Sequence, residues 1–237
     1  MDQQIPCRVA RPGDAAAVTA LISAAFVTDP LWSWAMARPD GSTAHHARLW
    51  RVFVDGALRY PWTWLTEHGE ACSVWIPPNG TEISEEQETR LALVAHEVLG
   101  ARAETYFELF ERFAAAHPRD EPHYYLSLLG TAPQHRGHGF GMSLLRHDLA
   151  LIDAEGVAAY LESSNPVNND RYASVGFQKI GEFQAPGHGP FVTTMWRPAR
   201  LADPGSDVPA TGRRKRRSRS ARRCRRDPRM IGTSSAH

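Results

Sequence analysis

Apolar residues recur at helical spacing in several stretches of the chain. In residues 15–26 they stand at Val18, Leu21, Ile22 and Ala25, on one face of an amphipathic helix. Similar stripes predict further helices over residues 48–58, 84–99, 101–116 and 142–155, and a short one over 168–174. Residues 29–34, which are rich in aromatic side chains, are expected to form a loop or a short helix.

Short β-rich runs separate these helices. They cover residues 7–11, 62–66, 72–76, 124–129, 158–162, 178–183 and 191–196. The second and third runs flank His68-Gly69 and predict a hairpin, and the last two predict a closing β pair. The nearly all-apolar run at 124–129 is typical of a central buried strand. Strand, glycine-rich turn, helix and strand then follow in order, which predicts a βαβ crossover and an α/β fold with one mixed sheet.

Charge divides the 237 residues into two parts. Residues 201–237 carry eleven Lys and Arg against three Asp, whereas residues 1–200 carry 16 basic and 23 acidic residues. We therefore expect one domain over residues 1–200 and a disordered, arginine-rich tail over 201–237. The tail is either a phosphate-binding arm for RNA or DNA or a solvated extension, and the lack of aromatics between its arginines favours the extension. The acidic body disfavours nucleic acid and suits a cationic small molecule.

Several classes of protein are disfavoured by what the sequence lacks. No apolar run approaches the roughly 18–20 residues of a membrane span, and the first residues do not resemble a signal peptide. Cys7, Cys72 and Cys224 lie far apart, which argues against a disulfide framework or a cysteine-rich zinc site. His45 and His46 are adjacent and make a poor ligand pair. We expect a cytoplasmic protein without a metal or a membrane segment.

The turn at residues 134–141 carries the most chemical information. Its sequence, Gln-His-Arg-Gly-His-Gly-Phe-Gly, joins the central strand to a helix. Glycines allow a ligand to approach the backbone closely, and a helix start presents free N–H groups to an anion such as a pyrophosphate. The turn lacks the Gly-Lys-Ser/Thr of a P-loop, and its glycine spacing departs from GxGxxG. Taken alone, it is equally compatible with a simple structural turn.

Two motifs in order resemble those of the GNAT superfamily of N-acetyltransferases. Gln134-x-x-Gly137-x-Gly139 after a strand resembles the coenzyme A signature, and Tyr172 followed by Gly176-Phe177 resembles the second signature. The resemblance spans about residues 5–198. Within the superfamily, Glu121-Pro122 and the run Leu-Glu-Ser-Ser at 161–164 most resemble puromycin N-acetyltransferase-like proteins.

The resemblance implies a fold and a co-substrate, acetyl-CoA. It implies a single mixed sheet of about six to seven strands with helices on both faces, in which the two central parallel strands splay to admit the pantetheine arm. Backbone groups near residue 130 would hold the arm, amides of the glycine turn the pyrophosphate, and Asn165 or Asn168 the pantetheine. The implied cofactor-binding residues are Leu129, Gly130, Thr131, Gln134, His135, Arg136, Gly137, His138, Gly139, Phe140, Gly141, Asn165 and Asn168.

The reaction implied is direct attack of an amine on the acetyl thioester. An alkylammonium has a pKa near roughly 10, so the amine needs a base and the departing thiolate benefits from an acid. We expect Tyr172 to be the acid and Glu162 the base, with His123 and Glu121 as weaker alternatives for the base. The competing interpretations are a tyrosine that packs in the core and a glutamate that forms a structural ion pair or is a hydrogen-bonded carboxylate.

The acceptor site is expected in the N-terminal half. Phe26, Asp29, Trp32 and Trp34 combine aromatic rings with a carboxylate, which suits a cationic, partly apolar amine, although these aromatics are equally compatible with ordinary core. The helices over 84–116 could wall this pocket. The predicted function is acetylation of a primary amine of a small molecule, an antibiotic or a metabolite, by a monomer or homodimer. The alternatives are a protein or peptide acetyltransferase, a non-catalytic CoA-binding protein, and a nucleic-acid-binding protein that uses the tail.

Overall fold

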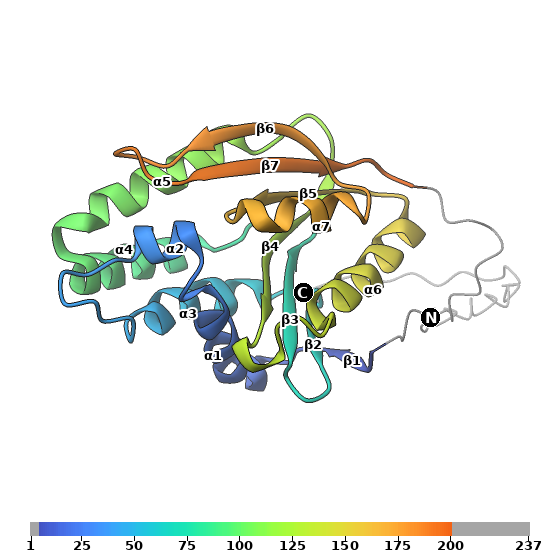
Figure 1. Ribbon diagram of the computed structural model, residues 1–237, viewed down its shortest axis with the longest axis horizontal. Helices are drawn as coiled ribbons and strands as arrows, with labels where there is room; N and C mark the ends of the chain where they lie inside the picture. Colours follow the sequence, from blue (N-terminus) through green and yellow to red (C-terminus); the bar gives the residue numbers. More distant parts are fainter. Residues whose placement is uncertain (1–4, 201–237) are drawn as a thin grey trace, which may run out of the picture. The chain divides into compact units, whose positions relative to one another are not determined.

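The computed structural model describes residues 5–200, which lie within one compact unit, and these residues build a single seven-stranded mixed sheet (Figure 1). Its strand order is β1-β2-β3-β4-β5-β7-β6. Only β4 and β5 pair in parallel, and every other neighbouring pair is antiparallel. The predicted α/β class with one mixed sheet is confirmed. The predicted disordered tail, residues 201–237, lies outside the described residues.

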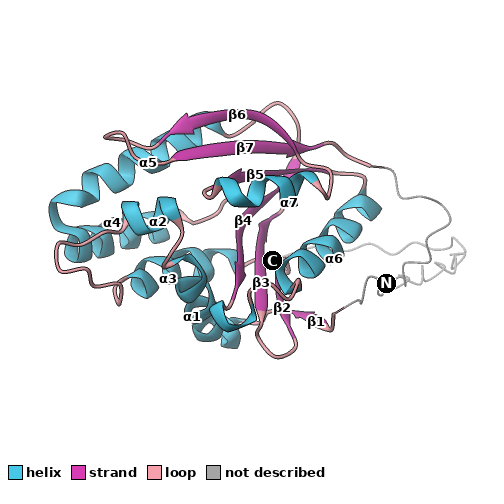
Figure 2. Cartoon of the chain, in the orientation of Figure 1, coloured by secondary structure: helices cyan, strands magenta, loops and turns pink. Residues whose placement is uncertain are grey.

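The elements follow the sequence pattern closely (Figure 2). The strands are β1 (Cys7–Val9), β2 (Thr63–Thr66), β3 (Ala71–Ile76), β4 (His123–Thr131), β5 (Ala158–Ser163), β6 (Gln178–Gln184) and β7 (Phe191–Arg197). The helices are α1 (Ala15–Phe26), α2 (Pro30–Ala35), α3 (His46–Ala57), α4 (Glu85–Leu99), α5 (Ala103–Ala116), α6 (Phe140–Glu155) and α7 (Asn169–Ala173). None of the helices within residues 5–200 is both long and apolar enough to cross a membrane.

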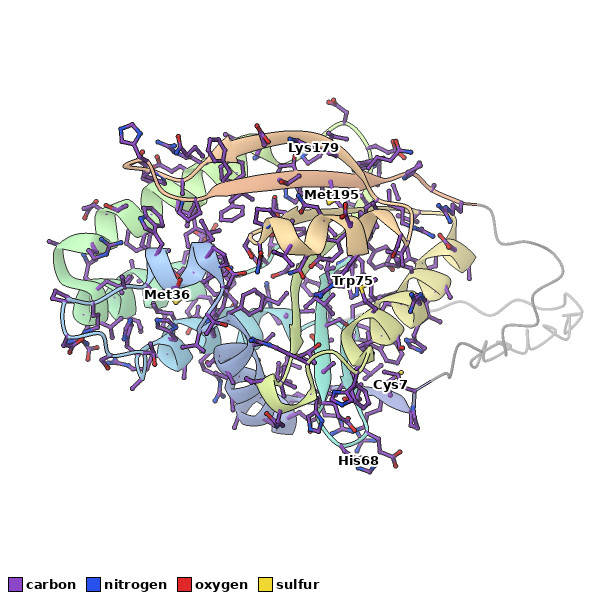
Figure 3. All side chains as sticks on the ribbon, viewed as in Figure 1. Cys7, Met36, His68, Trp75, Lys179 and Met195 are labelled. Carbon is purple, nitrogen blue, oxygen red and sulfur yellow. The ribbon has the colours of Figure 1, made fainter. Side chains whose placement is uncertain are left out.

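Helices cover both faces of the sheet, as expected. On one face α1, α2, α3, α4 and α5 pack into a large apolar core with side chains of β2 and β3. On the other face Leu145, Leu149 and Ile152 of α6 pack against Trp75 and the side chains of β4 and β5. Trp75, labelled in Figure 3, donates its indole N–H to the buried carboxylate of Asp148 on α6 at 2.9 Å. This hydrogen bond fixes α6, and therefore its N-terminus, against β3.

A β-bulge in β4 determines where the sheet opens. Val74 pairs with Leu128 and Trp75 with Leu126, so Ser127 is an extra residue on β4. Such an insertion disrupts the ladder locally and bends the strand. Pairing of β4 with β5 stops at Leu126 and Leu161, although β4 continues to Thr131. The two parallel strands therefore splay, as expected, and leave backbone groups of β4 unpaired on the edge that faces β5.

Candidate active site

A cleft of about 430 Å³ opens where β4 ends and α6 begins. Gly137 and Gly139 both have positive φ values, 82° and 83°, which only glycine adopts readily, and Gly139 is the N-cap of α6. The first N–H groups of a helix have no partner inside the helix, and the helix dipole adds positive potential there. The end of α1, the loop before α7 and α7 itself complete the walls of the cleft.

Arg136 ties the glycine turn to the end of α1. Its guanidinium donates to the carbonyl of Ala25 at 2.6 Å and to the hydroxyl of Thr28 at 3.3 Å. Close packing holds the other end of the turn, because a Cβ added to Gly141 would lie 2.6 Å from the hydroxyl oxygen of Thr131. The turn is thus fixed from both sides before any ligand binds.

Most of the expected cofactor residues line this cleft. They are Leu129, Thr131, His135, Arg136, Gly137, Gly139, Phe140, Gly141, Asn165 and Asn168. Gly130, Gln134 and His138 lie outside it. Gly130 faces α1 instead, where an added Cβ would stand 3.1 Å from Ala25, so its lack of a side chain permits close helix packing. Gln134 is exposed, and the ring of His138 lies against the carbonyl of Arg136.

The cleft has the groups that an acetyl-CoA molecule requires. Glycine backbone and helix N–H groups suit its pyrophosphate, and the unpaired edge of β4 suits the amide-containing pantetheine arm, which can add as a strand. Asn165 accepts a hydrogen bond from the N–H of Val167, and this leaves its amide N–H₂ available to a ligand. Arg171, which the sequence analysis did not select, also lines the cleft and adds a positive charge.

An inner chamber of about 80 Å³ continues from the cleft toward the helical face. Phe26, Leu129 and Tyr172 line both cavities. Six further aromatic side chains line the chamber, those of Trp32, Trp50, Phe53, Phe110, Phe113 and Tyr125. Beyond the chamber lies an outer cavity of about 1000 Å³, which shares Phe53, Phe110 and Phe113 with it. The chamber therefore shares lining residues with both the cleft and the outer cavity and lies between them.

Glu162 stands at the boundary between the chamber and the outer cavity, on the splayed part of β5. Its side chain is 2% exposed, and neither carboxylate oxygen accepts a well-aligned hydrogen bond within residues 5–200, although the hydroxyls of Tyr125 and Tyr160 lie close enough to interact with it. The nearest basic side chain is that of His117, whose Nδ1 lies 3.6 Å from Oε1. Burial, followed by the charge of Glu162, raises the pKa values of Tyr125 and Tyr160. A buried carboxylate without donors is costly unless a cation reaches it.

Tyr172 lies at the other end of the chamber, on α7. Burial, and then the charge of Asp29, raises the pKa of its phenol to about 12, while Arg171 opposes the shift. The phenol is therefore protonated at neutral pH. Its hydroxyl donates to no acceptor in the described part of the chain, residues 5–200, so the proton is available to a ligand in the cleft.

A family comparison agrees with this geometry. The model described as the acetyltransferase (GNAT) family matches residues 71–177. That segment is similar to the GNAT family. It includes β4, the glycine turn, α6, Glu162 and Tyr172, so both predicted catalytic residues and the predicted phosphate-binding turn lie inside it.

Solved GNAT-like structures share the fold of the whole described unit. A histone acetyltransferase HPA2-related protein from Corynebacterium glutamicum is 21% identical, with a TM-score of 0.57 over 84% of this chain and 98% of its own. An apo agmatine N-acetyltransferase variant is 16% identical, with a TM-score of 0.57 over 82% and 99%. A polyamine N-acetyltransferase from Drosophila melanogaster is 15% identical, with a TM-score of 0.56 over 81% and 98%. At these identities the likeness establishes the fold.

Two of the four expected acceptor residues have other partners. Asp29 is buried and caps α2, accepting from the N–H groups of Leu31 at 3.0 Å and Trp32 at 3.2 Å. Its second oxygen accepts from the hydroxyl of Ser164 at 2.8 Å. Burial raises the pKa of Asp29 while these hydrogen bonds oppose the rise. Asp29 therefore holds α2 and its neighbour Trp32 against the end of β5.

Trp34 lies outside the three cavities. Its ring packs against the backbone of Gly189 and under the guanidinium of Arg102, 5.8 Å from the ring centroid. Phe26, Asp29 and Trp32, in contrast, line the chamber. The aromatic cluster of the N-terminal half is therefore part core and part pocket wall.

Glu82 lines two of the cavities and is not indicated by any sequence motif. It lies in the loop before α4, lines the chamber and the outer cavity, and accepts a hydrogen bond from Ser127. Burial, and then the charge of Glu162, raises its pKa to about 7, while Ser127 and His117 oppose the shift. Phe110 and Phe113 are three residues apart on α5 and therefore lie on one face of the helix. This spacing is the sequence feature that indicates that α5 lines a pocket.

The weaker candidates for the base sit at the outer cavity. His123 and Glu121 both line it, and the imidazole of His123 contacts the Glu121 carbonyl and the His117 ring. His45 and His46 are buried in the α2–α3 region, with His45 bonded to the carbonyl of Met36. Within residues 5–200 no group of three His, Cys, Asp or Glu side chains is arranged to hold a metal ion.

Proposed function

We propose that this chain is an acetyl-CoA-dependent N-acetyltransferase that acetylates the primary amine of a small, partly aromatic molecule. The observation that carries the proposal is Glu162, a buried carboxylate without a well-aligned hydrogen bond, located between a cleft suited to acetyl-CoA and an aromatic-walled outer cavity. A protonated amine in the chamber would supply the missing cation and donors.

Each end of the chamber has one proton-transfer role. Glu162 accepts a proton from the ammonium group, which frees the nitrogen lone pair for attack. Acetyl-CoA, when bound, supplies the activated acetyl thioester. Tyr172, protonated at neutral pH, donates toward the sulfur that departs. The apolar walls exclude water and keep both groups in a low-dielectric environment, where their interactions with substrate are strong.

The chamber and the outer cavity define the acceptor class. Aromatic faces such as those of Phe53, Phe110 and Phe113 attract a flat ring or a cation, and Glu82 adds a second carboxylate. Compounds that combine a ring with a primary amine fit this description. The sequence resemblance to puromycin N-acetyltransferase-like proteins adds an antibiotic of that type to the candidates.

The first test is thermal unfolding of the full chain with and without acetyl-CoA. Binding at about 100 times the dissociation constant stabilises a protein by roughly 2.7 kcal/mol. Release of free CoA thiol is then measured with a panel of acceptors. The panel holds phenethylamine, puromycin, agmatine, a linear polyamine and a histone-derived peptide.

The Glu162→Gln variant is the matched control, because it keeps the shape of the side chain and removes the base. Acetyl-CoA stabilisation of both proteins, with ring-bearing amines acetylated by the wild type alone, supports the proposal. Acetylation of the peptide and no small amine would favour the alternative protein acetyltransferase. Binding of acetyl-CoA without any thiol release would favour the non-catalytic CoA-binding protein.

A further inference from the structure

Three groups form a continuous chain from the chamber to the outer cavity. His117 Nδ1 lies 3.6 Å from Glu162 Oε1, and His117 Nε2 lies 3.0 Å from His123 Nε2. His123 Nδ1 lies 2.7 Å from the backbone carbonyl oxygen of Glu121. The contact at Glu162 is longer than a hydrogen bond, as is common for catalytic contacts in the absence of substrate.

The contact of His123 with the Glu121 carbonyl restricts which nitrogen atoms of the two histidines carry protons. A carbonyl oxygen can only accept, so Nδ1 of His123 carries a proton. The Nε2 atoms of His117 and His123 face each other, so one of them donates to the other. When Nε2 of His117 is the donor, its Nδ1 is free to accept a proton from Glu162. The imidazole of His117 is therefore able to receive a proton at one nitrogen and release one at the other.

Packing holds both imidazole rings in place. His117 follows the last residue of α5 and precedes Pro118, and its N–H bonds to the carbonyl of Phe113. Its ring meets the rings of Tyr125 and Tyr160 edge-on, with centroids 4.9 and 4.8 Å apart. His123, at the start of β4, meets Trp196 of β7 edge-on at 5.1 Å. The chain is thus built from ordered side chains on α5, β4 and β5.

His117 is more exposed to solvent than Glu162. The side chain of Glu162 is 2% exposed and that of His117 is 30% exposed, and both histidines line the outer cavity. The charged and titratable groups that face them are Glu82 of the loop before α4, Glu121 of the loop before β4, Tyr125 of β4, and Tyr160 and Glu162 of β5. Burial, and then His117, lowers the pKa of His123 against the opposing hydrogen bond to Glu121, which favours release of a proton to water at neutral pH.

We propose that His117 and His123 relay the proton that Glu162 removes from the acceptor amine to water in the outer cavity. Glu162 passes this proton to Nδ1 of His117, and His117 gives its Nε2 proton to Nε2 of His123. His123, then protonated on both nitrogens, keeps its Nδ1 proton on the Glu121 carbonyl and releases its Nε2 proton to water. His117, whose side chain is 30% exposed, returns to the Nε2–H tautomer by proton exchange with water before the next turnover. One proton leaves per acetyl transfer, as conversion of an ammonium to an amide and of a thioester to a thiol requires. The proposal rests on the proposed function, because it gives that reaction its proton exit.

The test compares His117→Gln and His123→Gln with a matched control, His96→Gln. His96 is a half-exposed residue of α4 outside all three cavities. With the best amine of the panel, kcat is measured from pH 6 to 9, with and without added imidazole. We expect kcat at pH 7 to fall about tenfold or more in both relay variants and to recover at high pH. Added imidazole should restore part of the activity of His123→Gln, while KM for the amine and acetyl-CoA stabilisation stay unchanged.

A His123→Gln variant whose kcat and pH profile match those of His96→Gln would overturn the relay. A loss of activity that neither higher pH nor imidazole restores would also overturn it, because it would indicate a structural role. His123→Gln decides the question alone if His117→Gln does not fold. A wild type that acetylates no amine removes the proposed function and the relay together. An active wild type, an inactive Glu162→Gln and two fully active histidine variants remove only the relay.

Discussion

Replacing Glu162 by Gln should have opposite effects on stability and on activity. The carboxylate is buried, and neither oxygen accepts a well-aligned hydrogen bond from residues 5–200, with the phenols of Tyr125 and Tyr160 near it. Leaving a buried polar group unpaired costs about 1–3 kcal/mol, and a charged group costs more. Gln keeps the shape and removes the charge, so we expect the free energy of unfolding to rise by about 1–3 kcal/mol, or Tm by about 2–12 °C. Loss of the base should lower kcat by about 10²–10⁴-fold.

The assay pairs thermal unfolding without ligand with thiol release at saturating acetyl-CoA and amine. Glu111→Gln, which changes an exposed glutamate of α5, is the control for a simple change of charge. If Glu162 were a structural ion pair with His117, Glu162→Gln would be less stable than the wild type. That result, or unchanged kcat, would refute the assignment of Glu162 as a base that waits for a cation.

Three further predictions concern the acid, the phosphate site and the second carboxylate. Tyr172→Phe should lower kcat by about 10²-fold at pH 7 and leave the acetyl-CoA-induced rise in Tm intact, because only the phenolic proton is lost. Gly141→Val should weaken acetyl-CoA binding by about tenfold or more, seen as a smaller rise in Tm, because the added Cβ would lie 2.6 Å from the Thr131 hydroxyl oxygen. Glu82 binds its proton more tightly in the folded chain, with its pKa raised from 4.5 to about 7. Its contribution to stability is therefore fully present below pH 4.5 and is lost as the pH rises to about 7, an effect of about 3 kcal/mol. Urea unfolding at several pH values should show this decline in the wild type and a flatter profile in Glu82→Gln.

Local pattern was sufficient to predict most of the fold. The stripe in residues 15–26 predicts α1 with the bounds that the structure has. The sequence at the start of α4 fits a capping box, and in the structure Ser84 and Gln87 each accept a hydrogen bond from the other's backbone N–H. The sequence of residues 29–34 is compatible with either a loop or a short helix. Asp29 decides it, because its carboxylate satisfies the first N–H groups of α2 and Pro30 fits the first turn.

The site was predictable where one segment carries it and not where distant segments meet. The glycine turn and Tyr172 lie in motifs that can be read along the chain. Glu82 lies in no motif, and its role depends on Ser127 and Glu162, which reach it only through the tertiary fold. Gly130 shows the reverse case, since its place beside the signature suggested cofactor binding while its missing side chain admits α1.

Ser127 links the two halves of the site, and its effect has no signature in the sequence. The run from 124 to 129 is almost uniformly apolar, so an inserted residue leaves the pattern unchanged. Only the register with β3 reveals the insertion. A shift of one residue exchanges the two faces of a strand. Tyr124 and Leu126 therefore face α6 before the bulge, whereas Leu128 faces the helices of the opposite core after it. The same bulge lies where β4 separates from β5, which leaves the edge of β4 open on the side of the cleft. The hydroxyl of Ser127 donates a hydrogen bond to Glu82 on the side of the outer cavity. In the proposed reaction, one extra residue would thus influence the position of both substrates relative to Glu162.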